Sequence, residues 1–480
     1  MKNILIKQIG LILLLVIALN SCEDSIEGIN QDPLAAINID PALLFPQVIV
    51  SGISQPRTVE GNAVNMIAQQ WSSIVGFGVF INPERYIISP NTTNNLWIGN
   101  YTTGLRNLQQ VRALTERDNP SAINIIGQAK ILEAFIYLNT TLFFEDIPFN
   151  EAIQVQTFPN PNFDTQETVL RALPDLIDEG LEALATPTDI VEGGDLIYGG
   201  DRENWIRFGN SLKLKILMLI ANVDSASVQA AIQSTANQPL ISTPSQVAKL
   251  DYTLEPENGN GIWKLLRDFN GSENDFWGGG AALLDIMNAN NDPRRATYFD
   301  DVDGAYVPQL QGETGRTGFS PVSLNIIRPE MPDIYASAAE TNFYLAEAAL
   351  KGWISGDANT FYVAGIQASL DFYDGIPGEI SASDKTMYLS SPRGTITGDS
   401  EADALRKIHE EIYISNFTRG LEAWTNWRRN KVPNFEIPEG SILGDENIRR
   451  YNVPLSELTT NPNAPQSLPA LDVPMWFENE

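Results

Sequence analysis

Apolar residues recur at helical spacing in four zones of this chain. In the first zone, which begins at Gln128, the apolar positions three or four residues apart are Ile131, Phe135, Leu138 and Leu142. The second zone begins at Thr165, whose hydroxyl can cap a helix, and its apolar positions are Val169, Leu173, Leu176 and Leu181, then Trp205, Leu212, Ile216, Leu219 and Val223. This spacing predicts amphipathic helices, and the last segment is apolar almost all round, which indicates a buried helix.

The other two zones each contain two short periodic segments separated by a turn. The third covers residues 342–352 and 361–372, and the fourth has its apolar positions at Leu405, Ile408 and Ile412, then Phe417, Leu421 and Trp424. Paired helices that recur along a chain are typical of solenoids of tetratricopeptide type, although the usual period of roughly 34 residues is not kept here. The sequence therefore predicts an all-α, tetratricopeptide-like α/α solenoid.

Residues 225–335 and 375–400 lack sustained periodicity and are rich in Gly, Asn, Asp and Pro. We predict that they form large irregular, loop-rich insertions. Long irregular segments of a compact protein are usually functional or disordered, and the many aromatic residues between positions 252 and 306 favour order. The binding surface is therefore expected in the first of these two segments.

The chain begins with a short apolar run that follows Lys2 and Lys7 and ends at Leu19-Asn20-Ser21-Cys22. The run is too short to span a bilayer comfortably and is typical of a secretory signal. Cys22 is the only cysteine, and the small residue before it resembles a bacterial lipoprotein box, which implies cleavage after residue 21 and acylation of Cys22. An ordinary signal with a chance cysteine and an uncleaved anchor helix are the alternatives.

We therefore assign residues 1–21 to a lipoprotein signal peptide, residues 22–45, which show little periodicity, to a flexible tether, and residues 46–480 to a single domain. The formal charge of −29 disfavours nucleic acid and anionic membrane faces as partners, so membrane contact is expected only through the lipid anchor. No segment after the signal approaches the apolar length of a membrane helix.

A set of short sequence fragments carries a family resemblance over nearly the whole mature chain. In order they are Phe144–Ala152 (FEDIPFNEA), Asn162–Asp164, Gly194–Asp201 (GDLIYGGD) followed by Trp205, Asp292–Arg295 (DPRR), Leu345–Ala349 (LAEAA), Arg419–Trp424 (RGLEAW), Trp427–Arg429 and Arg449–Pro454. Together with Cys22 they resemble the SusD/RagB family of Bacteroidetes outer-membrane lipoproteins. Glu145 departs from the glycine that is usual in the first fragment.

The resemblance implies a surface lipoprotein that binds an oligosaccharide or polysaccharide and delivers it, as a lid, to a SusC-type TonB-dependent transporter. It implies a location at the outer membrane, facing outward. Glu23-Asp24-Ser25 is similar to the acidic signal that sends some such lipoproteins to the cell surface. A peptide ligand, or a scaffold without a small ligand, is the alternative.

No enzyme activity, cofactor or metal is expected. His409 is the only histidine, and no second cysteine is present for nucleophilic chemistry or zinc binding. Asp300–Gly304 lacks the remaining positions of an EF-hand, so we predict a solvated turn there. A glycoside hydrolase is a minor alternative because, among 60 acidic residues, some pair falls at a glycosidase separation by chance.

Sugar rings stack their apolar faces on aromatic rings, while their hydroxyls need amide, carboxylate or guanidinium partners. Aromatic residues with polar neighbours are therefore the candidate glycan contacts: Trp71, Trp97, Trp263, Phe276 and Trp277. We favour a ligand role for Phe276 and Trp277, because residues 278–280 are glycines that should leave the ring of Trp277 unobstructed. For Trp71 a core position is an equal alternative. For Trp97 it is at least equal, because Tyr101 lies four residues on and shares its helical face.

Other motif residues are predicted to be structural. Three tryptophans on apolar helical patterns are expected in the core, namely Trp205, Trp424 and Trp427. Asp195 and Asp201 are expected to accept hydrogen bonds from backbone amides in a glycine-rich loop. Arg428 and Arg429 end a predicted helix, where cations complement the helix dipole.

The ligand is expected to be neutral, because the chain carries a strong negative charge. A local basic patch at Arg294 and Arg295 would reverse this expectation. Replacement of Trp277 by alanine is expected to weaken retention of the ligand while the fold stays cooperative.

Overall fold

The computed structural model of this protein describes residues 40–187, 194–270, 274–314 and 317–478. The signal peptide and Cys22 lie outside the described residues. Residues 41–480 form one compact unit, and its first element is helix α3 (Pro41–Gln47). The tether predicted over residues 22–45 is therefore wrong for its last five residues, because Leu44 and Phe45 are buried in the core.

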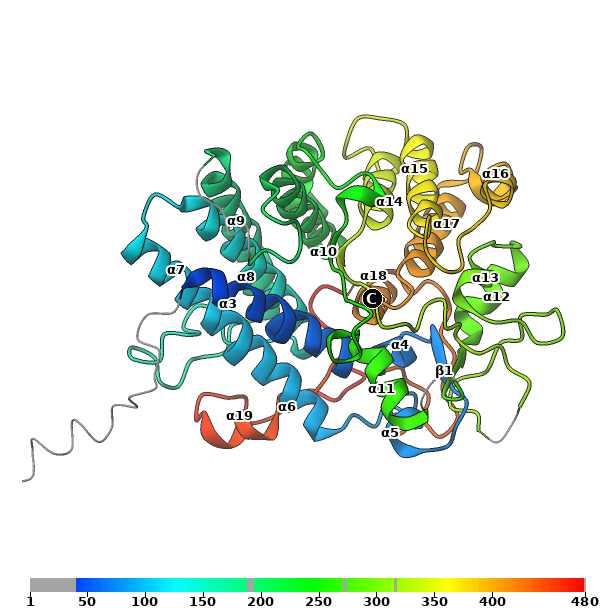
Figure 1. The fold of residues 1–480 in the computed structure, drawn as a ribbon, viewed down its shortest axis with the longest axis horizontal. Coiled ribbons are helices and arrows are strands. Elements are labelled where there is room, and N and C mark those ends of the chain that lie inside the picture. The colour runs from blue at the N-terminus through cyan, green and yellow to red at the C-terminus, as the bar shows by residue number, and fades with distance from the viewer. Residues whose placement is uncertain (1–39, 188–193, 271–273, 315–316, 479–480) are drawn as a thin grey trace, which may run out of the picture. The chain divides into compact units, whose positions relative to one another are not determined.

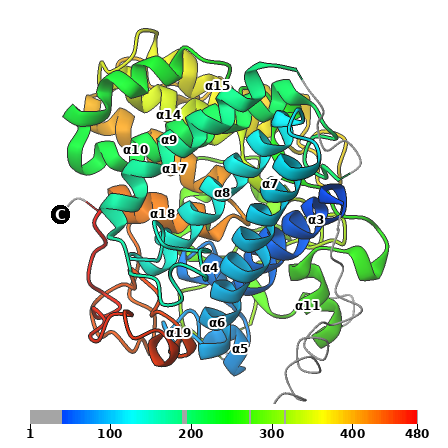
Figure 2. The same ribbon diagram turned by 90° about the vertical axis from the view of Figure 1, so that its left-hand side faces the viewer.

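Helices make up most of this unit (Figure 1). A series of longer helices comprises α7 (Arg106–Asp118), α8 (Ile123–Phe144), α9 (Gln166–Ala185), α10 (Arg202–Ala236), α14 (Ala338–Leu350), α15 (Ala358–Asp371), α17 (Glu401–Ser415) and α18 (Gly420–Asn430). Each helix packs on the next from α7 to α10, α10 packs on α14, and α14 contacts both α15 and α17, which is followed by α18. Figure 2 shows α7, α8 and α9 side by side. The prediction of an all-α, tetratricopeptide-like solenoid is confirmed, and all four periodic zones are helical.

Helices α8 and α9 meet at two glycines. A Cβ atom on Gly127 would lie 2.6 Å from the carbonyl oxygen of Gly180, so any larger residue would force the two helices apart. The close approach buries the apolar stripe of each helix, which consists of Ile131, Phe135 and Leu138 in α8 and of Val169 and Leu173 in α9. Thr165 caps α9 as predicted, because its hydroxyl accepts a hydrogen bond of 3.3 Å from the amide of Thr168.

Helix α10 is longer than the periodic zone that predicts it. The zone ends at Val223, whereas the helix continues to Ala236 after a kink at Asp224 (φ −145°, ψ 65°). By length and composition α10 would suffice to cross a membrane, contrary to the expectation from the sequence. It packs between α9 and α14, however, and Trp205 at its start is fully buried, as predicted. We therefore describe α10 as a central core helix.

The segments without helical periodicity contain short elements. Before α7 lie the π-helices η1 (Val48–Ser54), η2 (Pro56–Glu60) and η3 (Gly99–Leu105), the helices α4 (Asn62–Ile67), α5 (Gly78–Ile81) and α6 (Pro90–Ile98), and strand β1 (Trp71–Ser73). Later come α11 (Gly261–Asn270), α12 (Ala281–Ala289), α13 (Arg295–Tyr298), α16 (Ala382–Leu389) and α19 (Leu455–Thr460), with three 3-10 turns at Pro244–Gln246, Pro256–Asn258 and Pro392–Gly394. Strand β3 (Trp277–Gly279) pairs antiparallel with β1, and β2 (Ala248–Leu250) pairs antiparallel with β4 (Asp333–Ala336).

The glycine-rich loop before α10 is organised by Asp195, as predicted. Its carboxylate accepts hydrogen bonds from the amides of Ile197 and Gly200 (2.9 and 2.8 Å) and from the indole nitrogen of Trp205 (2.7 Å). Asp201 caps α10 by accepting from the amides that follow it. One buried carboxylate thus ties the loop to the first turn of the core helix.

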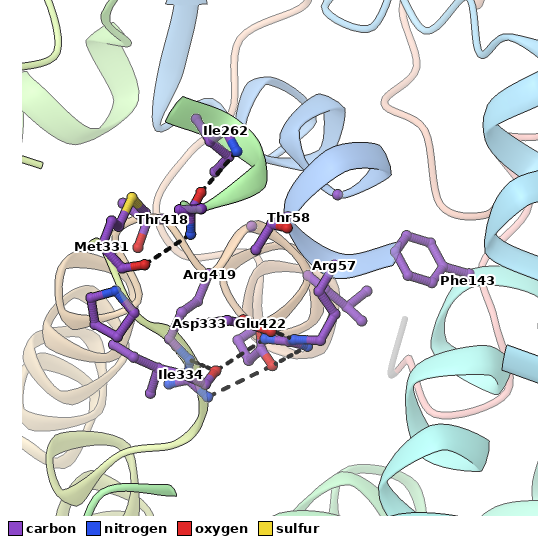
Figure 3. Close-up of a pocket in the computed structure, with 15 residues that line it drawn as sticks. Arg57, Thr58, Phe143, Ile262, Met331, Asp333, Ile334, Thr418, Arg419 and Glu422 are labelled. Atoms are coloured by element: carbon purple, nitrogen blue, oxygen red, sulfur yellow. Dashed lines mark hydrogen bonds and ion pairs between the residues drawn. The ribbon is translucent and has the colours of Figure 1, made fainter. Parts of the chain in front are cut away.

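A buried network of charges joins η2, α10, β4, α14 and α18. It contains three cations and three carboxylates, which are Arg57, Lys215, Arg419, Asp333, Glu340 and Glu422. Figure 3 shows Arg57 beside Asp333 and Glu422. Four of them, Arg57, Asp333, Arg419 and Glu422, line a cavity that holds only about 30 Å³, roughly the space of one water molecule. The network is therefore a structural connection between helices and offers no room for a nutrient.

Candidate functional site

Trp71 and Trp277, two of the predicted glycan contacts, are fully buried. They lie on the paired strands β1 and β3, with ring centroids 5.4 Å apart, and Trp71 also contacts Phe417 at 6.1 Å. The prediction that Trp277 presents an unobstructed ring in a polar loop is wrong. For Trp71, the structure shows the core position that the sequence left open.

The glycines after Trp277 serve close packing. A Cβ atom on Gly279 would lie 2.9 Å from the side chains of Leu284 and Phe299, and one on Gly280 would overlap the carbonyl oxygen of Gln69. The side-chain amide of Asn274, a polar neighbour of Trp277, donates to the carbonyl oxygens of Trp277 and Val322 (2.9 and 2.8 Å). The small and polar residues of this segment therefore bring β3 against β1.

Trp97 is also a core residue, with 7% of its surface exposed. Its ring packs against Tyr101 (4.7 Å between centroids), Phe144 (5.2 Å) and Phe163 (6.0 Å). The shared helical face of Trp97 and Tyr101 was the observation that favoured the core, and it is confirmed. The two remaining candidates, Trp263 on α11 and Phe276 before β3, are half-buried.

Phe276 belongs to a cluster of rings that reaches the surface. We call Phe77, Phe80, Phe269 and Phe276 the aromatic patch. Phe80 is fully buried and stacks on Phe276, with centroids 4.3 Å apart and planes 4° from parallel. Phe77 and Phe269 lie on top of Phe80, are 58% and 49% exposed, and have centroids 6.3 Å apart. Among the residues that the structure describes, no other aromatic side chain is classed as exposed.

The elements below hold the aromatic patch in place. Phe77 immediately precedes α5, Phe269 lies near the end of α11, and Figure 1 places α5, α11 and β1 at the same end of the molecule. Trp277 packs beneath Phe80 at 5.5 Å and rests on Trp71. The buried tryptophans are thus the base of the patch.

Polar side chains of α11 border the two exposed rings. Arg267 lies 5.3 Å above the ring of Trp263 and forms an ion pair with exposed Asp268 (2.8 Å), next to Phe269. Guanidinium and carboxylate groups at the margin of a ring suit a ligand that carries many hydroxyls. Trp263 makes no ring contact with the patch among the described residues but shares its helix with Phe269, so it stays a candidate at the border.

Sequence reasoning missed Phe77 and Phe269. Phe77 stands between Gly76 and Gly78, and Phe269 lies inside the polar, aromatic segment that the sequence singled out. The segment contains one of the two exposed rings, Phe269, whereas its tryptophan Trp277 is buried. An amphipathic pattern over residues 261–270 was the available signal, because it places Phe269 on a helix end.

A buried carboxyl group connects the strands below the patch. Glu84 is fully buried and accepts hydrogen bonds from the amides of Ser73 in β1 and of Gly312 (2.7 Å for the latter). Burial raises the pKa of Glu84 to about 8, against the opposing effect of these hydrogen bonds. The carboxyl group is therefore protonated at neutral pH.

Stability is expected to fall as the pH rises from about 5 to 8, because the folded-state pKa of Glu84 lies above its unfolded value. The slope contributed by this group is about 1.4 kcal/mol per pH unit in that window. The variant Glu84→Gln cannot ionise, so its unfolding free energy should change by about 2 kcal/mol less than that of the wild type between roughly pH 6 and pH 7.5. Urea titrations at both pH values measure this difference. Parallel pH profiles of the two proteins would contradict the assignment.

Other motif residues are structural. Arg294 is fully buried between Asp292 (2.5 Å) and Glu411 (2.8 Å), so the possible basic patch at Arg294 and Arg295 does not form. Arg428 and Arg429 are likewise buried, and the former donates to the carbonyl oxygen of Leu142 at 2.7 Å. Both arginines form contacts between helices. This role differs from the expected interaction with the helix dipole.

His409 and the acidic turn both have structural surroundings. His409 is buried with its Nε2 atom 3.3 Å from Glu347, and burial lowers its pKa. Asp300–Gly304 forms a turn in which the Gly304 amide donates to Asp301 (2.7 Å). Within the described ranges, no group of three or more His, Cys, Asp or Glu side chains could hold a metal ion.

Comparisons with known proteins agree with this architecture. Residues 33–454 match the family model described as "Starch-binding associating with outer membrane". The chain is similar to the solved structure of a chitin-binding protein (23% identity, 89% of this chain, 95% of that one, TM-score 0.76). It is also similar to a chitin-binding SusD homologue from Flavobacterium johnsoniae (21%, 88% and 92%, 0.72) and to a SusD homologue from Bacteroides fragilis (22%, 92% and 99%, 0.73). No curated protein matches the chain.

Proposed function

The chain belongs to the SusD-like family described as starch-binding and associating with the outer membrane, and from this premise we propose that it binds a neutral oligosaccharide or polysaccharide at the aromatic patch. The observation that carries the proposal is the pair of exposed rings of Phe77 and Phe269 on a buried aromatic base. Exposed aromatic faces are costly in water, and stacking against the C–H face of a sugar offsets that cost. The chitin binding named for two similar structures supports a glycan ligand.

The net charge of the chain favours neutral glycans over anionic ones. A net charge of −29 repels polyanions at long range, and the arginines that might have formed a basic patch include fully buried Arg294. A neutral glycan is therefore the ligand class. A shallow surface with two exposed rings gives micromolar to millimolar affinity, roughly −8 to −4 kcal/mol.

The same proposal includes delivery of the glycan to a SusC-type TonB-dependent transporter, for which this protein acts as a lid and not as an enzyme. Acylation of Cys22, after removal of residues 1–21, would hold the single domain at the outer membrane, facing outward. The family description of outer-membrane association and the position of the only cysteine after an apolar run support this placement. Mass spectrometry of the mature protein tests it, and a free thiol on Cys22 would contradict it.

The double variant Phe77→Ala/Phe269→Ala is expected to bind the glycan about 10- to 100-fold more weakly than the wild type. Each stacked ring contributes roughly 0.5–1.5 kcal/mol to the binding free energy, and the double variant removes both rings. Affinity gels containing starch or soluble chitin, and calorimetry with malto- and chito-oligosaccharides, measure the loss.

A matched control is Phe158→Ala, which removes a half-buried ring outside the patch. This control should bind as the wild type does. Equal retention of all three proteins would remove the patch from consideration. Saturable binding of peptides without binding of glycans would show that the ligand is a peptide. Release of reducing sugar from a glycan would show that the protein is a hydrolase.

A further inference from the structure

A second cavity, separate from the aromatic patch, lies where the end of α15 meets β2 and the segment before β4. It holds about 590 Å³, within the roughly 300–1,000 Å³ of ordinary ligand pockets. Its lining includes Lys249, Asp251, Tyr252, Arg328, Glu330 and Phe372. None of the residues that line it belongs to the aromatic patch.

Most charges at this cavity already have partners. Lys249 pairs with Asp251 (2.5 Å). Asp371 and Asp374, at the far wall, both pair with Lys385, the former at 2.9 Å. These groups nearly cancel one another, so they favour neither a strongly charged anion nor a strongly charged cation.

Arg328 and Glu330 differ from the other charged groups. The guanidinium of Arg328 donates to the carbonyl oxygen of Asn325, and within the described ranges no carboxylate lies within ion-pair distance of it. Its pKa is lowered by burial. One carboxylate oxygen of Glu330 is shielded from solvent and accepts no hydrogen bond from a described residue. Buried polar atoms are normally paired, so the Glu330 oxygen suits a ligand hydroxyl. The half-buried guanidinium of Arg328 has further N–H donors besides the one that Asn325 accepts.

An aromatic ring completes the cavity. Phe372 is half-buried at the C-terminal end of α15, where its edge contacts Tyr373 at 5.3 Å between centroids. A ring, a guanidinium and a carboxylate that line one cavity match a ligand with one apolar face and hydroxyls at its rim. The described residues offer no group of three metal ligands, so a metal ion does not explain the carboxylates.

We propose that this cavity is a second saccharide site, which takes the end of a short neutral oligosaccharide. One sugar ring packs on Phe372, while its hydroxyls donate to Glu330 and accept from Arg328. The site needs no contribution from Phe77 or Phe269, so a long glycan could be held at two places on the same molecule.

The test uses hydrogen–deuterium exchange in the Phe77→Ala/Phe269→Ala background, with maltohexaose and N-acetylchitohexaose as probes at about 10 mM. Residual binding should slow exchange several-fold in residues 244–252, 328–332 and 371–377. Adding Arg328→Met should abolish this slowing and weaken residual binding by about tenfold or more, because a charged hydrogen bond is lost. Adding Arg106→Met, which removes an exposed arginine elsewhere, should change neither readout.

Two results would overturn the second site. One is slowing that persists in the Arg328→Met protein, provided that its melting curve matches that of the Arg106→Met control. The other is that neither probe slows exchange in these three segments, whether in the wild type or in the double variant. If residues 74–80 and 261–270 of the wild type are slowed in that case, the aromatic patch keeps its proposed function. If they are not, both sites fail for these glycans.

Discussion

Replacement of Arg57 by methionine is expected to lower the free energy of unfolding by about 3–5 kcal/mol. Arg57 is buried 3.2 Å from Asp333 and 3.2 Å from Glu422. Methionine keeps much of the side-chain volume but removes the positive charge, so both carboxylates stay buried with one cation fewer. Urea-induced unfolding, followed by circular dichroism at neutral pH, measures the loss.

The size of this loss should depend on pH. Burial disfavours the ionised form of Glu422, but Arg57, Arg419 and Lys215 outweigh burial and lower its pKa to about 2. A carboxylate whose pKa is lowered on folding stabilises the protein above its unfolded pKa, and the contribution disappears as the pH falls through the folded value. The difference between wild type and Arg57→Met should therefore shrink on acidification from about pH 5 to about pH 2.

Arg117→Met is the matched control, because Arg117 pairs with Asp118 at 2.6 Å on the surface, where the two side chains are 52% and 54% exposed. Exposed ion pairs contribute roughly 0–1 kcal/mol, so this variant should unfold close to the wild type. If Arg57→Met unfolded at the same urea concentration as Arg117→Met, the buried network would not connect the helices as described.

Replacement of Trp277 by alanine is expected to cost about 3–5 kcal/mol of stability. Its ring is fully buried against Trp71 and below Phe80, so truncation leaves a cavity in the base of the aromatic patch. The sequence alone predicted that this variant would retain its ligand more weakly while the fold stayed cooperative, whereas the buried ring predicts a loss of stability. Binding should fall as well, because Phe276 and Phe80 lose their support. Chemical denaturation and affinity gels together measure both effects.

Phe269→Ala provides the contrast, because the ring it removes is 49% exposed. This variant should lose binding while its unfolding free energy stays within roughly 1 kcal/mol of the wild type. Trp277→Phe should recover much of the stability by refilling the cavity. A stable Trp277→Ala protein that cannot bind glycan would instead restore Trp277 as a direct contact.

The helices of the solenoid could be predicted because their stabilising pattern is local. The stripe of Ile131, Phe135 and Leu138 has helical spacing whatever lies opposite, and Thr165 caps α9 through a residue three positions on. The π-helical turns near the N-terminus, such as Val48–Ser54, were not predicted, because they do not follow the usual spacing. Glu145, where the family usually has glycine, adopts φ 67° and forms an ion pair with Arg450, a residue 305 positions away.

The candidate site was only partly predictable, because it depends on contacts distant in sequence. Gly, Asn and Asp around Trp277 have the composition of an exposed loop, but β3 pairs with β1 about 200 residues earlier, and that pairing buries the tryptophan. The exposed rings come from two separate segments, at Phe77 and Phe269, that meet over Phe80. Neither segment contains a local sequence pattern that predicts its contact with the other.

By itself the sequence determined the helical class and the acidic character of the protein, since periodicity, turns and net charge are properties of neighbouring residues and of composition. The tertiary structure alone decided which aromatic rings face solvent and which charged groups are buried, as Phe269 and Arg57 illustrate. Exposure depends on what other elements cover, and that is settled only when segments far apart in the chain pack together.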